Sequence, residues 1–444
     1  MRDPHLVMRL HALMRKISTR TRLKSAILYF IVVGNFLSLI SPGFGSPAHF
    51  YYDENLLIWS AEGIAHMVWG LGVTKGQLAL FTNDWFHNIM PLMGNRDALQ
   101  IILERTRTAP SPVFLGRYPP GIGLTLYLFF SIFGLHFWVA RMATTIFHIG
   151  TLILFTYNLK RLTKGFSLAA IGGFLFSTVP MSSYFGRLVV DFIPALFFMT
   201  LAVTFYSSSY RQKSVRSRLV PALLALCFAC FYNWVGFILF AFLLLFELRR
   251  SDRSGRNIAA VFIVFMSMLV LLIVPLVLTG VSIGGYRNGT LVDNLWLQFQ
   301  IFVHRTFLST QNDAGQPFTV YQWVTNFISV NVWGFTLLVP PLAICGLGLY
   351  VRRVRRRPLM YVERVNGILG LVGVSFVALL AQGVYVHMYY QYFLLPGEVY
   401  LASTILNAVY SQDWGLQWVS KLFVICALAS VYYLARVTIF GTFI

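Results

Sequence analysis

The chain has few charged residues for its length. Of its 444 residues only 11% are charged, while 57% are hydrophobic and 16% are aromatic, and the mean hydropathy is +0.69. Soluble globular domains carry about 25% charged residues and about 45–50% apolar ones. The composition of this chain therefore excludes a soluble globule. A membrane-spanning helix needs about 20 apolar residues, and the chain has enough of them for many such helices. The composition predicts an all-α polytopic integral membrane protein.

Cysteine is also scarce. The four cysteines, Cys227, Cys230, Cys345 and Cys426, all lie inside apolar runs. Cys227 and Cys230 have CxxC spacing, but a second pair of the kind that zinc sites use is missing. We therefore expect no metal or redox site at these cysteines and interpret all four as core residues.

Acidic residues are far outnumbered by basic ones. The chain has 15 Asp and Glu against 35 Lys and Arg, which gives a formal net charge of +20. Most of the basic residues fall in five short runs between apolar segments, namely 2–24, 160–164, 211–218, 249–256 and 352–364. Short basic loops beside membrane spans stay in the cytoplasm. The excess of basic residues therefore marks the cytoplasmic loops of a membrane protein. No nucleic-acid partner is expected.

Fixing the basic runs on the cytoplasmic side predicts about eleven transmembrane helices, with the N-terminus inside and the C-terminus outside. The predicted spans are 25–42, 136–159, 166–181, 188–206, 219–232, 234–248, 257–280, 329–351, 366–386, 395–410 and 419–437. Residues 1–24 form a basic cytoplasmic segment, and the first span is interpreted as an uncleaved signal anchor. Basic runs at both ends of 219–248 require an even number of crossings. That stretch is therefore divided into two helices at Tyr232-Asn233.

Two long loops remain on the outer side, 43–135 and 281–328. The first is expected to contain juxtamembrane helices, and its apolar segment 118–134 has no full crossing to make. We predict a re-entrant or steeply lying helix there, begun by Pro119-Pro120, since proline suits the first helical turn. Ten of the 15 acids then face outward: Asp53, Glu54, Glu62, Asp84, Asp97, Glu104, Asp191, Asp293, Asp313 and Glu398. Carboxylate chemistry is therefore expected on the extracytoplasmic face.

The adjacent acids Asp53 and Glu54 follow the first span by about ten residues. A carboxylate held at the membrane surface could act as a general base toward a hydroxyl group. Acids also suit the N-terminus of the helix that the following apolar residues predict, and both interpretations can hold together. The pair could bind a divalent cation with His49, although no spacing requires it.

Arginines supply the candidate phosphate ligands. Arg117 and Tyr118 precede the paired prolines, where an arginine could bind phosphate or simply extend its charge to the interface. Arg141 lies in the span that follows. Arg187 and Asp191 are spaced i and i+4 at the outer end of another span, which fits either a functional site or an ion pair on one helix face.

A late outer segment, His387-Met-Tyr-Tyr390-Gln-Tyr, combines a histidine with tyrosines. His387 and Tyr390 could bind phosphate or sugar there. The alternative is an aromatic belt at the membrane interface.

The order of these motifs is similar to that of the GT-C glycosyltransferases of the protein O-mannosyltransferase and lipid A aminoarabinose transferase type. An acidic pair, paired prolines, an arginine in the next span and Arg-x-x-x-Asp succeed one another over residues 25–250. The resemblance implies the GT-C fold and a catalytic transmembrane module over 25–250, including loop 43–135. Residues 251–444 then supply C-terminal transmembrane helices with loop 281–328. Tyr118 stands where family members often have histidine.

The resemblance also implies the reaction. It predicts a sugar transferred from a polyprenyl-phosphate donor to a hydroxyl group of a lipid, glycan or protein, on the outer face of a plasma membrane or its equivalent. Asp53 matches the proposed base, Glu54 its partner and Asp191 a later acid. The main alternative is a multi-span flippase or transporter of lipids or lipid-linked sugars. The lack of a visible internal repeat counts against that alternative.

Overall fold

The computed structural model describes the chain in segments. These are residues 23–41, 43–46, 54–74, 79–82, 84–114, 119–162, 166–209, 216–248, 319–356, 360–381, 387–411 and 417–441, with a few single positions between them. Asp53, Arg117, Tyr118, the predicted span 257–280 and most of the predicted loop 281–328 lie outside these segments.

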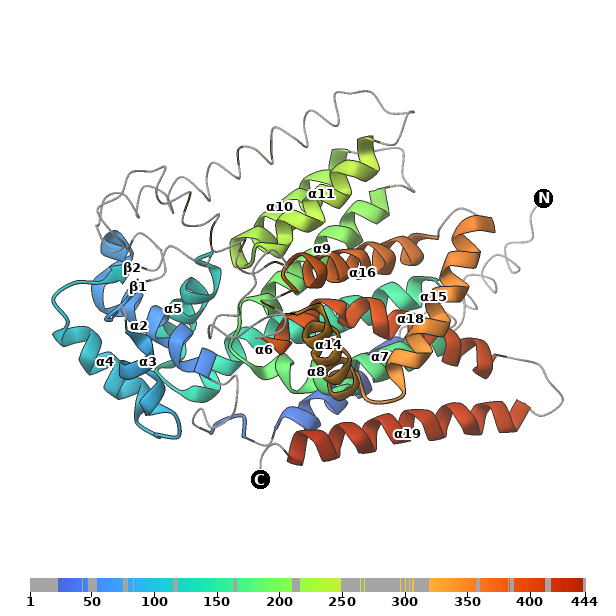
Figure 1. The fold of residues 1–444 in the computed structure, drawn as a ribbon, viewed down its shortest axis with the longest axis horizontal. Helices are drawn as coiled ribbons and strands as arrows, with labels where there is room; N and C mark the ends of the chain where they lie inside the picture. The colour runs from blue at the N-terminus through green and yellow to red at the C-terminus, as the bar shows by residue number, and fades with distance from the viewer. Residues whose placement is uncertain are drawn as a thin grey trace, which may run out of the picture.

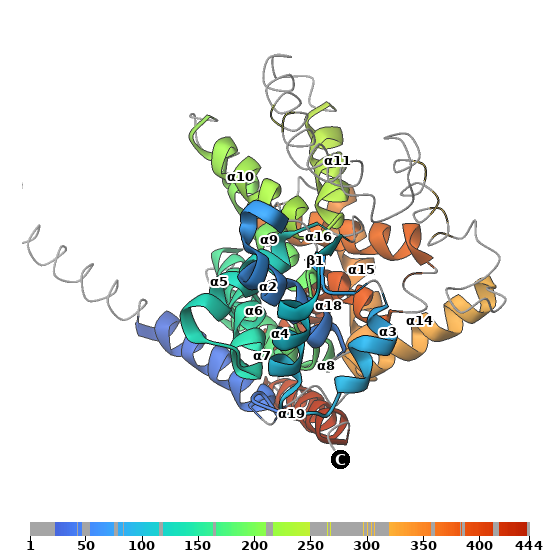
Figure 2. The ribbon, with the colours of Figure 1, turned by 90° about the vertical axis from the view of Figure 1, so that its left-hand side faces the viewer.

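Residues after the first helix form a small module at one end of the molecule (Figure 1, left; facing the viewer in Figure 2). Its elements are α2 (Glu54–Thr74), β1 (Ala79–Leu80), α3 (Trp85–Asn88), the 3-10 turn η1 (Met90–Leu92), α4 (Ala98–Thr108), β2 (Val113–Phe114) and α5 (Gly121–Phe133). The two strands pair antiparallel, Ala79 with Phe114 and Leu80 with Val113. Helix α2 packs against both α4 and α5. Helices are therefore present within 43–135, and their place on the outer side of the membrane stays a prediction.

The module has an apolar core, which also includes side chains of α6 (Phe137–Leu162), and α4 contributes one face to it. Along α4, Leu99, Ile102 and Leu103 are buried, while the arginines of its last turn are exposed. This i, i+3, i+4 spacing buries one helix face, and the basic last turn complements the helix dipole. The buried face of α4 packs against apolar side chains of α2 and α5.

The remaining helices form a bundle beside this module (Figure 1). They are Leu23–Ile40, α6 (Phe137–Leu162), α7 (Ser167–Thr178), α8 (Pro180–Ser183), η2 (Phe185–Arg187), α9 (Phe192–Ser209), α10 (Arg216–Tyr232), α11 (Val235–Leu248), α14 (Val320–Phe335), α15 (Val339–Arg356), α16 (Tyr361–Leu379), η3 (Met388–Leu394), α18 (Leu395–Tyr410) and α19 (Gln417–Gly441). Helix α19 runs along one edge of the bundle.

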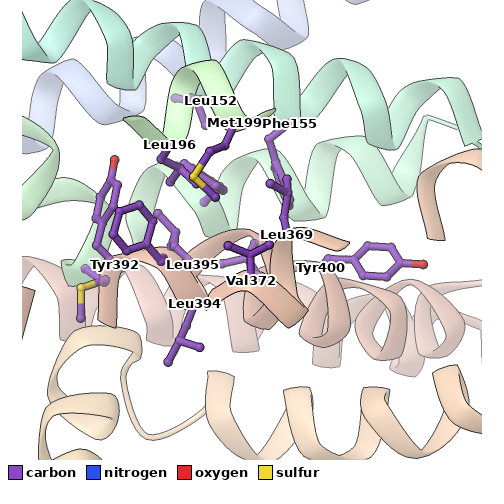
Figure 3. Close-up of a cluster of buried hydrophobic side chains, with 14 of the residues drawn as sticks. Leu152, Phe155, Leu196, Met199, Leu369, Val372, Tyr392, Leu394, Leu395 and Tyr400 are labelled. Atoms are coloured by element: carbon purple, nitrogen blue, oxygen red, sulfur yellow. The ribbon is translucent and has the colours of Figure 1, made fainter. Parts of the chain in front are cut away.

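One continuous core joins helices from early and late parts of the chain. Figure 3 shows side chains from α6, α9, α16, η3 and α18 meeting there: Leu152, Phe155, Leu196, Met199, Leu369, Val372, Tyr392, Leu394, Leu395 and Tyr400. Polar side chains also join neighbouring helices within the apolar bundle. Asn35 of the first helix donates to Ser177 and Thr178 at 2.8 and 2.9 Å.

Several helices have the length and apolar composition that a membrane protein needs. Of the described residues, four helices could cross a membrane by length and composition: Leu23–Ile40, Asn55–Thr74, Phe137–Arg161 and Trp418–Val437. Two bent helix pairs raise the count to six if each pair is one span. The total of eleven spans and the orientation of the termini stay predictions.

Two local predictions are confirmed, the start of a helix at the paired prolines and the break in 219–248. Helix α5 begins directly after Pro119-Pro120, and its 13 residues extend only ~20 Å at 1.5 Å per residue, less than the ~30 Å of a bilayer core. The stretch 219–248 divides into two helices: α10 ends at Tyr232, and α11 begins at Val235.

Three other predictions need correction. The single span predicted at 329–351 is two helices, α14 and α15, which meet at 100°. The bend includes Thr336, whose φ of 67° lies in the left-handed region, and Pro340-Pro341 open the first turn of α15. The span 166–181 is likewise broken, since α7 and the segment begun by Pro180 are bent by 61°.

The third correction concerns the cysteines. Cys230 is buried and Cys227 is partly buried, but Cys345 and Cys426 are exposed on the protein surface. An apolar helix places some apolar residues toward lipid and others toward protein, so apolarity alone does not locate a side chain in the core.

Candidate functional site

The turn between α8 and α9 carries Arg187 and Asp191, and α6 holds it in place. Thr144 of α6 donates to the carbonyl of Leu188 at 2.8 Å, and Thr145 donates to that of Gly186 at 3.3 Å. A Cβ at Gly186 would lie 2.8 Å from the ring of His148, so only glycine allows this approach. The polar face of α6 thereby fixes the backbone on which both charged residues lie.

Arg187 and Asp191 are both buried, with 3% and 7% of their surfaces exposed. The Arg187 guanidinium lies 5.3 Å from the centroid of the Tyr184 ring. Arg187 belongs to η2, whereas α9 begins only at Phe192. The two residues therefore do not share one helix face, and Asp191 immediately precedes a helix N-terminus, a position that favours a negative charge.

Asn233 links Asp191 to the break between α10 and α11. Its Nδ2 donates to Asp191 Oδ2 at 2.7 Å, and its Oδ1 accepts from the amide of Val235 at 3.0 Å. The preceding residue, Tyr232, makes a 2.7 Å hydroxyl contact with Thr125 of α5. The helix break that the even number of crossings predicts thus brings polar groups next to Asp191.

Glu62 of α2 is a further acid at this place, and the sequence did not single it out. It is fully buried, and within the described residues both of its carboxylate oxygens lack a hydrogen-bond partner. His66 Nε2 lies 3.8 Å from Glu62 Oε1. Glu62 is therefore a second buried carboxyl, on a helix that packs against α5, and α5 in turn contacts Tyr232 beside Asn233.

Gly123 provides the space for Glu62. A Cβ at Gly123 would lie 2.0 Å from Glu62 Cδ, and the neighbouring Gly63 likewise brings α2 against α5, since its Cβ would lie 2.8 Å from Leu126 Cβ. Gly123 on α5 and Gly63 on α2 thus set the distance between the two helices.

We expect Gly123→Ala to lower the free energy of unfolding by about 1–3 kcal/mol, because overpacking a filled interior costs this much. Combining it with Glu62→Ala should remove most of that loss, since contacting residues are energetically coupled. Thermal unfolding of the single and double variants in nanodiscs measures the effect. Gly72→Ala is the control, because a Cβ there meets nothing within 4 Å. Additive losses would contradict the close contact.

Arg141 holds the chain that follows the first helix. Its side chain is 2% exposed, and Nη1 donates to the carbonyls of Phe44 and Ser46 at 2.9 and 2.6 Å. This segment leads toward Asp53 in the sequence. The described contacts therefore favour a positioning role for Arg141, and its predicted phosphate contact stays a prediction.

Replacing Arg141 by alanine should loosen this segment. Each charge-assisted hydrogen bond contributes about 1.5–3 kcal/mol, so we expect the amides of Phe44 and Ser46 to exchange hydrogen at least about tenfold faster. Hydrogen–deuterium exchange measures this directly. Arg161→Ala, at the other end of α6, should leave these amides unchanged, and unchanged exchange in Arg141→Ala would refute the contact.

The late aromatic segment forms η3 and docks beside the same turn. The Tyr389 ring stacks on the ring of Phe192, the residue that follows Asp191, with 5.3 Å between ring centroids. The centroid of the His387 ring lies 5.1 Å from that of Tyr389. Tyr392 hydrogen-bonds His148, which also contacts Ser182 at 2.8 Å. Tyr390 is 6% exposed and meets Phe376 edge-on.

The structure thus brings Arg187, Asp191 and the His387–Tyr392 segment together, and it adds Glu62 and Asn233. Glu54 begins α2, but its side chain, like Asp53, Arg117 and Tyr118, lies outside the described part of the chain. Among the described residues, no group of three metal-ligating side chains occurs.

Comparison with known proteins supports the fold. No family model and no curated protein matches the sequence. Among solved structures, ArnT from Cupriavidus metallidurans bound to undecaprenyl phosphate matches with a TM-score of 0.58 and 14% identity, covering 94% of this chain and 74% of that one. The archaeal oligosaccharyltransferase AglB from Archaeoglobus fulgidus, in complex with an inhibitory peptide and a dolichol-phosphate, matches with a TM-score of 0.57 and 14% identity.

The AglB match covers 94% of this chain and 56% of AglB, so the chain spans little more than half of that enzyme. ArnT and AglB are both GT-C glycosyltransferases. The chain therefore has the GT-C fold, which confirms the resemblance found in the sequence at the level of the fold.

Proposed function

We propose that the protein is a membrane glycosyltransferase that takes a sugar from a polyprenyl-phosphate donor and transfers it to a hydroxyl acceptor. The observation that carries the proposal is the fold match over 94% of the chain to a structure that holds undecaprenyl phosphate. AglB, which matches to the same extent, was solved with a dolichol-phosphate. The burial of Arg187, Asp191 and Glu62 supports it, because buried ionisable groups in a membrane protein mark functional sites.

The proposed reaction is a single displacement with inversion at the anomeric carbon. Asp53 takes the proton from the acceptor hydroxyl as its oxygen attacks that carbon. The bond between the anomeric carbon and the phosphate oxygen breaks, and polyprenyl phosphate leaves with the bonding electrons. Arg187 stabilises the charge that develops on the departing phosphate, an effect that is often the largest catalytic contribution. Arg117, Tyr118, His387 and Tyr390 are proposed to line the donor site.

The site is proposed to face the extracytoplasmic side of a plasma membrane or its equivalent. The basic runs of the sequence support this orientation, because they place most carboxylates outside. A polyprenyl-phosphate sugar keeps its lipid tail in the bilayer and its sugar at the surface, so such a site needs contact with both. The acceptor is proposed to be a lipid, a glycan or a protein.

Release of polyprenyl phosphate tests the proposal. Purified protein in nanodiscs would be incubated with a panel of polyprenyl-phosphate sugars and hydroxyl acceptors, with and without divalent cations. We expect release that depends on both one donor and one acceptor. No release from any donor, in folded protein that binds the lipid, would favour the flippase instead.

A further inference from the structure

Three polar side chains from distant parts of the sequence converge in the second half of the bundle. Asn331 lies on α14, Gln391 on η3 and Glu398 in the first turn of α18. Asn331 Nδ2 donates to Glu398 Oε1 at 2.9 Å and to Gln391 Oε1 at 3.4 Å. We call these three residues the amide–carboxylate cluster.

Two atoms of this cluster have no hydrogen-bond partner. Gln391 Nε2 and Glu398 Oε2 are both buried and unpaired within the described structure, and the whole Gln391 side chain is inaccessible to solvent. Leaving a buried polar group unpaired costs about 1–3 kcal/mol, so such groups in natural proteins call for an explanation. Because Asn331 contacts both partner side chains, the two unpaired atoms belong to one small region.

The chemistry of the two atoms selects the class of ligand. Gln391 Nε2 is a donor and Glu398 Oε2 an acceptor, and a hydroxyl group can accept from one and donate to the other. A phosphate would place its own acceptor oxygens against the acceptor Oε2 of Glu398. A metal ion would leave the amide of Gln391 unpaired, and the described residues supply no set of three ligands.

Aromatic rings connect the cluster with the turn that carries Arg187. Trp333, two residues after Asn331 on α14, meets the Tyr184 ring edge-on at 5.7 Å. Arg187 lies over the same Tyr184 ring. On η3, Tyr389 stacks on Phe192 beside Asp191. Ligand sites commonly combine such aromatic walls with a few convergent polar groups.

We propose that Asn331, Gln391 and Glu398 form a subsite that recognises a sugar hydroxyl group. This inference rests on the proposed transferase function and adds to it a place for the hydroxyl-rich part of a substrate. The hydroxyl can belong to the sugar of the donor or to a glycan acceptor, because both offer the same chemistry.

Glu398→Gln and Gln391→Met test the subsite, since each nearly retains the size of the side chain. Glu398→Gln replaces one carboxylate oxygen by an amide donor, and Gln391→Met removes the free amide donor together with the oxygen that accepts from Asn331. In the donor arm, binding of undecaprenyl phosphate is compared with binding of undecaprenyl phosphate that carries a hexose, a pentose or an aminopentose. We expect the variants to lose about 10- to 100-fold of the preference for the sugar-bearing lipid and to bind the bare lipid as the wild type does.

In the acceptor arm, the KM for a glycan acceptor rises about 10- to 100-fold in the variants, while kcat and donor binding stay near wild type. Either arm supports the subsite and identifies the source of the hydroxyl. Thr404→Val is the matched control on α18, because the Thr404 hydroxyl donates to Leu401 of its own helix at 2.7 Å. Gln391→Asn, which retains the amide, is the milder variant where Gln391→Met fails to fold.

Unchanged donor preference together with unchanged acceptor KM in folded variants would overturn the subsite and assign the cluster to a bound water. The donor arm measures binding and needs no turnover. Failure of the subsite and failure of the proposed transfer reaction are therefore separate results.

Discussion

Asp53→Asn is expected to lower the rate of sugar transfer by about 100- to 10,000-fold, the range that general acid–base catalysis contributes. Asparagine has nearly the shape of aspartate but cannot take the proton from the acceptor hydroxyl. Donor binding should change little, so the loss should appear in kcat. Turnover of the donor found in the panel, measured with saturating acceptor, gives the value.

Asp97→Asn is the matched control for this variant. Asp97 is an exposed acid at the N-cap position of α4, and its side chain caps no amide there. We expect it to turn over at the wild-type rate. Wild-type kcat in Asp53→Asn would rule out Asp53 as the base and leave Asp191 and Glu62 as the acids to test.

Arg187→Ala is expected to lower kcat/KM by about 100- to 1,000-fold. Removing one preorganised group that stabilises developing charge costs about that much in other enzymes, and Arg187 is buried, where charge interactions are screened less than at the surface. Arg187→Lys should recover part of the activity, because lysine retains the charge but not the planar fork of donors.

Arg107 offers a control for the loss of an arginine as such. It is exposed on α4 and pairs with Glu104 at 2.8 Å, and exposed pairs of this kind contribute little. Arg107→Ala should therefore behave as wild type. If Arg187→Ala is folded and keeps wild-type kcat/KM, the phosphate must bind elsewhere, and Arg117 becomes the next residue to replace.

Several features could be predicted from the sequence because they depend on local or compositional signals. The break at Tyr232-Asn233 follows from the basic runs on either side, and the start of α5 follows from Pro119-Pro120. Pro340-Pro341 carry the same signal at the start of α15, but they lie inside one long apolar run. A long apolar run predicts a single span, and its composition does not show the bend at Thr336.

The candidate site could be predicted only in part, since it depends on contacts between distant residues. Arg187 and Asp191 stand out as charges at the end of an apolar span. Glu62 and Gln391 do not, because nothing near them in sequence shows that α5 or α14 will bury them. Tyr392 likewise gains its role only when η3 brings it to His148.

Sugar transfer and lipid translocation can be measured together in proteoliposomes with a donor labelled in its sugar. The account predicts that one labelled sugar reaches the acceptor, with inverted anomeric configuration, for each polyprenyl phosphate released. Label that crosses the bilayer while still attached to polyprenyl phosphate, with none on the acceptor, would contradict the transferase and establish a flippase.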